Sequence, residues 1–299
     1  MITVIGSINL DLIATVARLP ERGETVPGDG FCTAPGGKGA NQALAAARAG
    51  AATRMTGAAG SDAFAGQALA LLADGGVDLS GVATVDGPTG TALILVGGDG
   101  ENMIAVIPGA NAGVTPEMAR AAASSGGHVL LQHEIPLESV DAALEATRAA
   151  NGVSLLNTAP YRAEAAPLLA KADYVIANET EFDLYAGALG LAGASREARM
   201  ANFVHVTGRT VIVTLGSAGA LAMTPEGSIA VPSLPVTPVD TVGAGDTFCG
   251  YFAAALDRGL ILEDALRLAA AAGSLACLKP GAQPAIPLAA EVEEILINF

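Results

Sequence analysis

Short apolar runs alternate with longer helical patterns along most of this chain, and this order constrains the fold more than any other feature. Residues 2–7 form the first apolar run, and four more lie at 128–132, 153–157, 174–178 and 210–216. Helical patterns rich in alanine and leucine, such as 39–50, 63–76 and 138–150, lie between several of these runs. This order predicts an α/β fold with a mainly parallel central sheet and helices on both faces. Ligands of such sheets bind at the carboxyl ends of the strands.

Two segments interrupt the alternation. Residues 11–35 and about 86–107 have the pattern of strands joined by turns, and the second contains a hairpin around Gly97–Gly100. An ordinary antiparallel edge of the main sheet is one interpretation. Both segments run into polar, glycine-rich loops, which favours a small separate β flap. Because α/β folds of this length often form one unit, we predict a single domain over residues 1–299 with the two segments inserted.

The charge balance excludes one class of partner. The net charge is −15, with no dense basic run, whereas nucleic-acid binding needs clustered Lys and Arg side chains. Small phosphorylated ligands remain possible, since backbone amides and a metal can hold them. We expect no membrane partner, because no apolar stretch approaches 18 residues without glycine or charge. The 3 cysteines are widely spaced and form no CxxC, so we expect a cytoplasmic protein without disulfides.

The stretch "GAGDTF" begins at Gly243, directly before an apolar helical pattern. If Gly243, Ala244, Gly245 and Asp246 start a helix, the free amides there favour an anion, and the glycines leave it room. Asp246 would then lie where a transferring phosphoryl group is held, placed to accept a proton from an attacking hydroxyl. A helix cap formed by the same aspartate explains this stretch about equally well.

Two further stretches near the N-terminus combine flexible backbone with polar side chains. In "PGGKGANQA" (35–43), Gly36 and Gly37 allow close approach to the backbone, and Lys38 and Asn41 can hydrogen-bond a polyol. In "GSINLD" (6–11), we expect Asn9 and Asp11 to end the first strand on one side and to bind hydroxyl groups. Each stretch taken alone is also compatible with a plain turn.

Polar residues also follow two later strands. In "NETE" (178–181), the oxygen ligands of Asn178, Glu179 and Glu181 suit Mg²⁺, directly or through water, although acidic residues are equally typical of a helix start. "TLGSAG" (214–219) is a glycine turn that could hold a nucleotide.

Taken together and in this order, "GGKGANQA", "NETE", "TLGSAG" and "DTVGAGDTF" resemble the ribokinase and phosphofructokinase-B-type family of carbohydrate kinases, nearly from end to end. The resemblance implies a ribokinase-like α/β fold with a β-sheet lid that closes over the sugar and often pairs two subunits, hence a homodimer. It also implies transfer of phosphate from ATP to the 5-hydroxyl of D-ribose. The alternatives are a kinase of deoxyribose, a nucleoside or another sugar, or a sugar-binding regulator without catalysis.

The resemblance also implies roles for single residues. The catalytic base falls on Asp246, beside an anion hole formed by the amides of Gly243, Ala244 and Gly245. Sugar contacts fall on Asn9, Asp11, Gly37, Lys38, Asn41, Glu134 and Asp246. Nucleotide contacts fall on Asn178, Thr214, Leu215, Gly216, Ser217, Ala218, Gly219 and Gly245, and water-mediated Mg²⁺ contacts fall on Asn178 and Glu181. An activating K⁺ falls on Asp240, Val242, Ala276, Lys279 and Gly281.

Three residues depart from the family pattern. Ala270 stands where Asn or His is frequent near the adenine, and Ala285 replaces a frequent serine near the cation. His133 stands where an apolar residue is common, directly before Glu134. None of these departures touches the expected base or the anion hole.

Overall fold

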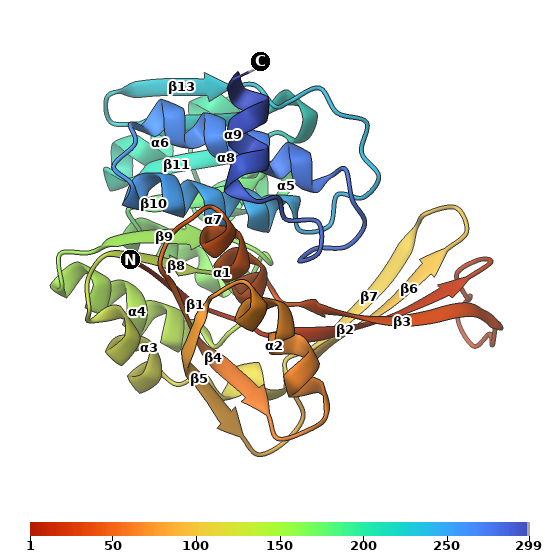
Figure 1. Ribbon diagram of the computed structural model, residues 1–299. Coiled ribbons are helices and arrows are strands. Elements are labelled where there is room, and N and C mark those ends of the chain that lie inside the picture. The colour runs from red at the N-terminus through yellow and green to blue at the C-terminus, as the bar shows by residue number, and fades with distance from the viewer. Residues whose placement is uncertain (298–299) are drawn as a thin grey trace.

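The computed structural model describes residues 1–297, in which nine strands form one large sheet in the order β13-β12-β11-β10-β9-β8-β1-β4-β5 (Figure 1). These strands are β1 (Ile2–Ile5), β4 (Thr53–Gly60), β5 (Asp78–Val85), β8 (His128–Leu131), β9 (Val153–Asn157), β10 (Tyr174–Asn178), β11 (Thr210–Thr214), β12 (Ala220–Thr224) and β13 (Gly227–Val231). In this spatial order, every neighbouring pair of strands between β11 and β5 is parallel. Strands β12 and β13 add an antiparallel edge next to β11. The predicted α/β fold with a mainly parallel sheet is confirmed.

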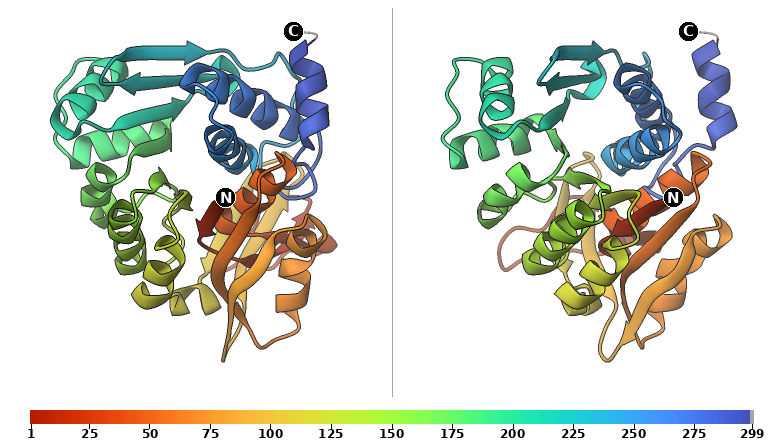
Figure 2. Two further views of the ribbon diagram at one scale, coloured as in Figure 1. Left: turned by 60° about the vertical axis from the view of Figure 1, so that its left-hand side comes forward. Right: turned by 90° about the vertical axis from the view of Figure 1, so that its left-hand side faces the viewer.

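Helices cover both faces of this sheet (Figure 2). They are α1 (Lys38–Arg48), α2 (Phe64–Asp74), α3 (Pro116–Ala123), α4 (Leu137–Ala149), α5 (Glu179–Ala188), α6 (Arg196–Thr207), α7 (Ala244–Asp257), α8 (Leu262–Ala276) and α9 (Ala289–Ile297). Neighbouring side chains on a strand point to opposite faces. Val4 therefore joins the core beneath α1, α7 and α8, whereas Ile5 joins the core beneath α3 to α6. Within residues 1–297, no helix has the length and hydropathy of a membrane span.

A second, four-stranded sheet projects from the body of the molecule (Figure 1). Its order is β3-β2-β6-β7, with bounds β2 (Asn9–Val16), β3 (Gly28–Gly36), β6 (Gly90–Gly97) and β7 (Asn102–Ile107). The predicted small separate sheet is confirmed, and the hairpin turn lies at 97–101, where the Gly97 amide donates to the Glu101 carbonyl. The single domain over 1–299 stays a prediction, and its last two residues lie outside the described part of the chain.

One prediction about the first strand is wrong. Asn9 and Asp11 do not end it, because β1 stops at Ile5 and residue 9 begins β2 of the small sheet. The segment between β1 and β2 is held at Ile8, where the Asn111 side chain accepts from the Ile8 backbone amide (2.8 Å) and donates to the Ile8 carbonyl (3.2 Å). Asn9 and Asp11 consequently lie at the root of the projecting sheet, beside the body of the molecule.

Candidate functional site

Helix α7 begins at the predicted glycine turn. Gly243 precedes it in the left-handed conformation (φ 77°), and no side chain caps this helix start. Gly243, Gly245 and Asp246 line a cavity of about 230 Å³ at this end of the helix. Of the three predicted amides, that of Ala244 donates to the Thr241 carbonyl at 3.3 Å. The amides of the first helical turn have no partner within the helix itself, so this end of α7 suits an anion.

Asp246 is buried and turns away from its own helix towards α1. Its Oδ2 accepts from Asn41 Nδ2 and its Oδ1 from Gln42 Nε2, each at 2.9 Å. Asp246 is only 7% exposed and Gln42 is completely buried. Asn41 was predicted and Gln42 was not, although it stands next to Asn41 in the same quoted stretch. A glutamine inside an alanine-rich helical pattern is the signal that could have revealed it.

Lys38 points into the same cavity as Asp246. Among the described residues that line this cavity, Lys38 is the only one with a basic side chain. Asn178 and Glu181 also line the cavity. The carboxylate of Asp246 is the main reason that the pKa of Lys38 is raised, so the ammonium form is favoured there. Lys38 was predicted among the sugar contacts. In the structure its side chain lines the cavity at the start of α7.

Glu134 links the beginning of α1 to the segment between β1 and β2. Its Oε2 accepts from the Lys38 amide at 3.0 Å and from Ser7 Oγ at 2.5 Å. A carboxylate at a helix N-terminus is favoured by the free amides and the helix dipole. Ser7 was not predicted, although it lies in the "GSINLD" stretch.

Asn9 and Asp11 lie close to these groups. Asn9 Oδ1 accepts from Asn111 Nδ2 at 2.7 Å, an interaction not predicted. The pKa of Asp11 is raised to about 6, first by burial and then by the nearby charges of Glu134 and Asp246. Gly36 is required here because a Cβ on it would lie 2.5 Å from Asp11 Oδ2. Three carboxyl groups from distant parts of the chain therefore gather at one place.

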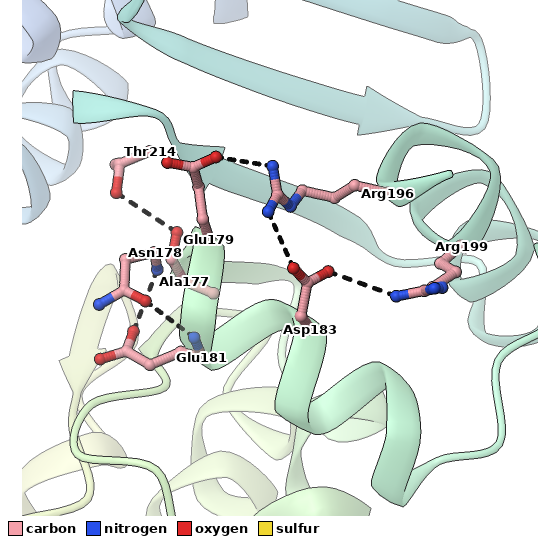
Figure 3. A network of polar contacts seen from close by, with 8 residues as sticks. All are labelled: Ala177, Asn178, Glu179, Glu181, Asp183, Arg196, Arg199 and Thr214. Atoms are coloured by element: carbon pink, nitrogen blue, oxygen red, sulfur yellow. Dashed lines mark hydrogen bonds and ion pairs between the residues drawn. The ribbon is translucent and has the colours of Figure 1, made fainter. Parts of the chain in front are cut away.

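The "NETE" stretch forms the start of α5 (Figure 3). Asn178 Oδ1 accepts from the Glu181 amide at 2.8 Å, and Glu181 Oε2 accepts from the Asn178 amide at 3.0 Å, which is a capping box. Arg196 holds the outer side of this turn through Glu179 and Asp183. Residues 1–297 contain no cluster of three His, Cys, Asp or Glu side chains suited to a metal. The helix-start interpretation thus applies, and the Mg²⁺ contacts of Asn178 and Glu181 stay a prediction.

A second cavity, of about 290 Å³, continues from the first and shares Thr214, Thr241 and Gly245 with it. The predicted residues Gly216, Ser217 and Gly219 line it, whereas Leu215 and Ala218 do not. Its apolar wall was largely missed by the sequence analysis and consists of Leu234, Pro235, Val236, Pro238 and Phe248, together with Ala270. The cavity therefore offers an apolar slot beside a glycine turn.

The predicted K⁺ residues lie in the loop before α7, at the last residue of α8 and in the loop that follows it, and Asp240 joins these two segments. Its carboxylate accepts from the amides of Val242 (3.0 Å) and Gly281 (2.8 Å), and its own amide donates to the Cys277 carbonyl (3.2 Å). The Val242 side chain is exposed, and Ala276 and Ala285 are buried. Lys279 forms an ion pair with Glu291 at 3.3 Å. The loop that precedes α7 is thus tied to the loop that follows α8.

His133 is buried next to the site without entering either cavity. Its Nδ1 lies 3.1 Å from the Tyr185 hydroxyl, and burial lowers the pKa of His133 to about 4. The imidazole is therefore neutral near pH 7, and no charge is added beside Glu134.

Comparisons with known proteins extend over this whole arrangement. The model of the pfkB family of carbohydrate kinases matches residues 1–289. A ribokinase of Bacillus subtilis is 38% identical over 299 residues, which cover 99% of either chain. A crystal structure of ribokinase from Thermotoga maritima has a TM-score of 0.93 at 33% identity, covering 100% of this chain and 99% of its own. The structure of Arabidopsis thaliana ribokinase complexed with ribose and ATP has a TM-score of 0.87 at 34% identity, covering 99% and 98%. The predicted resemblance is confirmed, and the chain belongs to the pfkB family of carbohydrate kinases.

Proposed function

We propose that this chain transfers the γ-phosphoryl group of ATP to the 5-hydroxyl of D-ribose, giving ribose 5-phosphate and ADP. One observation carries the proposal: a buried carboxylate, a lysine and the start of a helix converge on one cavity, which continues into a partly apolar slot. The choice of ribose is supported by the similarity to the Bacillus and Arabidopsis ribokinases over nearly the whole chain.

The phosphoryl-transfer step follows from the groups around this cavity. Asp246 accepts the proton of the sugar hydroxyl as its oxygen forms the new bond to the γ-phosphorus. The bond between that phosphorus and the β–γ bridging oxygen breaks in line with the attack, and ADP leaves. The amides of Gly243 and Gly245 and the ammonium group of Lys38 stabilise the negative charge of the transferring group.

The proposed sugar site lies on the other side of Asp246. Asn41 Oδ1 is buried and has no hydrogen-bond partner among the described residues, so it is ready to accept from a hydroxyl. Asn9 uses its Oδ1 on Asn111 and keeps its NH₂ group as a donor. Asp11 and Glu134 add carboxylate acceptors, and Gly37 lets the backbone come close. This mixture of donors and acceptors suits vicinal hydroxyls of a free sugar.

In this proposal, the base of the nucleotide lies in the larger cavity. Its phosphates extend along Gly245, which lines both cavities, towards the smaller one. Leu234, Val236 and Phe248 supply apolar contacts for the base, and residues 214–219 supply backbone groups. Asn178 and Glu181 would hold Mg²⁺ through water, because the single side-chain oxygen of Asn178 and one carboxylate oxygen of Glu181 are already used in the capping box. When bound, that ion neutralises charge on the β- and γ-phosphates.

The proposal includes activation by K⁺. Asp240 and the loop at 277–281 fix the backbone before α7, and a bound cation would hold those amides in place, which is electrostatic preorganisation. We expect faster turnover in KCl than in NaCl at equal ionic strength. Steady-state rates in buffers without K⁺ check this, and equal rates in the two salts contradict it. The buried Ala285 contributes no hydroxyl ligand to the proposed K⁺ site.

A homodimer and a cytoplasmic location belong to the same proposal. The small sheet exposes apolar side chains on β7, including Met103 (52%), Ile104 (56%) and Val106 (54%), as a sheet that pairs with another copy would. Sedimentation of the purified chain tests the dimer, and a monomeric mass at micromolar concentration contradicts it.

The proposed cytoplasmic location is supported by the three cysteines, which are all free, as in a reducing compartment. Localisation of a tagged chain outside the cytoplasm would contradict it.

A panel of acceptors tests the proposed substrate. We expect kcat/KM to be highest for ribose and lower for 2-deoxyribose, adenosine, fructose and fructose 6-phosphate. The site has carboxylates at Asp11 and Glu134 that repel a second phosphate, and an analogue without a bonded hydroxyl leaves buried groups unpaired. A preference for fructose 6-phosphate or a nucleoside would overturn the assignment. Sugar binding without ADP release would instead indicate a regulator without catalysis.

A further inference from the structure

Gln42 makes more contacts with the site than the sequence suggested. Its Nε2 donates to Asp246 Oδ1 (2.9 Å) and to Asn157 Oδ1 (3.1 Å), and its Oε1 accepts from Gln132 Nε2 (2.6 Å). Gln42 and Gln132 are both completely buried. We propose that Gln42, held by Gln132, is a positioning residue that fixes the rotation of the Asp246 carboxylate for proton transfer. This inference rests on the proposed role of Asp246 as the base.

The orientation of the Asn157 and Gln42 side-chain amides follows from their hydrogen-bond partners. Asn157 Nδ2 donates to the Ile176 carbonyl at 3.2 Å, so its oxygen must face Gln42. An ionised Asp246 accepts only, so Gln42 must turn its NH₂ group towards both oxygens and its own oxygen towards Gln132. The reversed amide would bring three oxygens together. Gln132 is placed by Gly6, where a Cβ would lie only 2.0 Å from Gln132 Oε1.

The two side chains that donate to Asp246, Asn41 and Gln42, are therefore held in place to different degrees. Among the described residues, Asn41 Oδ1 has no hydrogen-bond partner, and the Asn41 amide is bonded only through Asp246. No other hydrogen bond among the described residues holds that side-chain amide when a sugar arrives. Gln42 is held at both ends of its amide and cannot turn without breaking bonds to Asn157 and Gln132. Gln42 thus holds Oδ1 of the carboxylate in place while Asn41 and the sugar rearrange around Oδ2.

A neutral amide donor also favours the ionised carboxylate without competing for its proton. The other ionisable groups near Asp246 are Asp11, Lys38, Glu134, Glu181 and the buried Cys249 thiol, and none of them bonds to Oδ1 in the described structure. Loss of the Gln42 donor should consequently shift the acid limb of the pH–rate profile to higher pH.

The test compares Gln42→Met, Gln42→Glu and Gln132→Met with the unmodified enzyme. Methionine keeps the length of the side chain and removes its donors. For Gln42→Met we expect kcat to fall about 10-fold, the scale of one hydrogen bond to a charged group, with KM for ribose and ATP nearly unchanged. The acid limb of the pH–rate profile should move to higher pH. Gln42→Glu should shift it further, because two adjacent carboxylates share a proton. Gln132→Met should give a smaller shift in the same direction.

Ser139→Ala is the control for a purely structural effect. Ser139 is completely buried in α4 and donates to the Val114 carbonyl at 2.7 Å, outside the site. Its loss should lower Tm and leave the pH profile unmoved. If Gln42→Met changes only Tm, as Ser139→Ala does, the positioning role is wrong. If Asp246→Asn itself keeps full activity, the failure lies instead with the proposed base.

Discussion

Replacing Asp246 with asparagine is expected to lower kcat by at least about 10²-fold, the usual scale of a lost general base. Asparagine cannot accept the hydroxyl proton, yet it fits the site. Its oxygen can take the place of Oδ1 opposite Gln42, whose donor direction is fixed. Its NH₂ group then meets Asn41, whose amide can reverse because Oδ1 has no other partner among the described residues. The fold and the affinity for the sugar should therefore survive.

Asp257→Asn provides the matched control on the same helix. Asp257 binds the N-terminal amine at 2.7 Å and the His128 ring at 3.1 Å, at the far end of α7 from the cavity. This substitution should lower Tm slightly and leave kcat unchanged. Turnover is measured by ADP release and sugar binding by titration calorimetry. If Asp246→Asn turns over as fast as Asp257→Asn, Asp246 has no catalytic role and serves only the structure.

The architecture was predictable because each element carries a local signal. Apolar strands such as 210–214 and alanine-rich helices such as 38–48 are visible in their periodicity, and the glycine-rich loops mark the ends of strands. The small sheet was predicted for the same reason, from a hairpin pattern that does not fit between parallel strands. The exit from β1 was misplaced because it depends on Asn111, whose bonds to Ile8 cross about a hundred residues of sequence.

The parts of the site that were missed are those formed by distant partners. Gln42 and Ser7 stand inside quoted motifs, but their importance appears only when α7 and the segment after β8 bring Asp246, Gln132 and Glu134 to them. The apolar slot has no motif at all, because its wall combines the 234–238 segment with side chains of α7 and α8. Local patterns identify single residues, whereas hydrogen-bond networks require the tertiary contacts.

The glycine that precedes α7 should be nearly as sensitive as the aspartate. For Gly243→Ala we expect kcat to fall about 10²- to 10³-fold, the scale of a lost oxyanion donor. The residue has φ 77°, and its new Cβ would lie 2.8 Å from the Ala282 Cβ. Ala282 is nearly buried and follows Gly281, whose amide is bonded to Asp240, so the loop has little freedom to yield. The start of α7 must shift instead, and its amides then miss the transferring phosphoryl group.

Gly259→Ala separates this displacement from simple backbone strain. Gly259 has φ 78° just after the other end of α7, and a Cβ there would meet nothing within 4 Å. Both alanines suffer a left-handed backbone, which costs about 1–2 kcal/mol, so both should lower Tm. Only Gly243→Ala should also lower kcat. If the two variants lose the same stability and both keep full turnover, the amides at the start of α7 do not stabilise the transition state, and the anion hole must be sought elsewhere along the cavity.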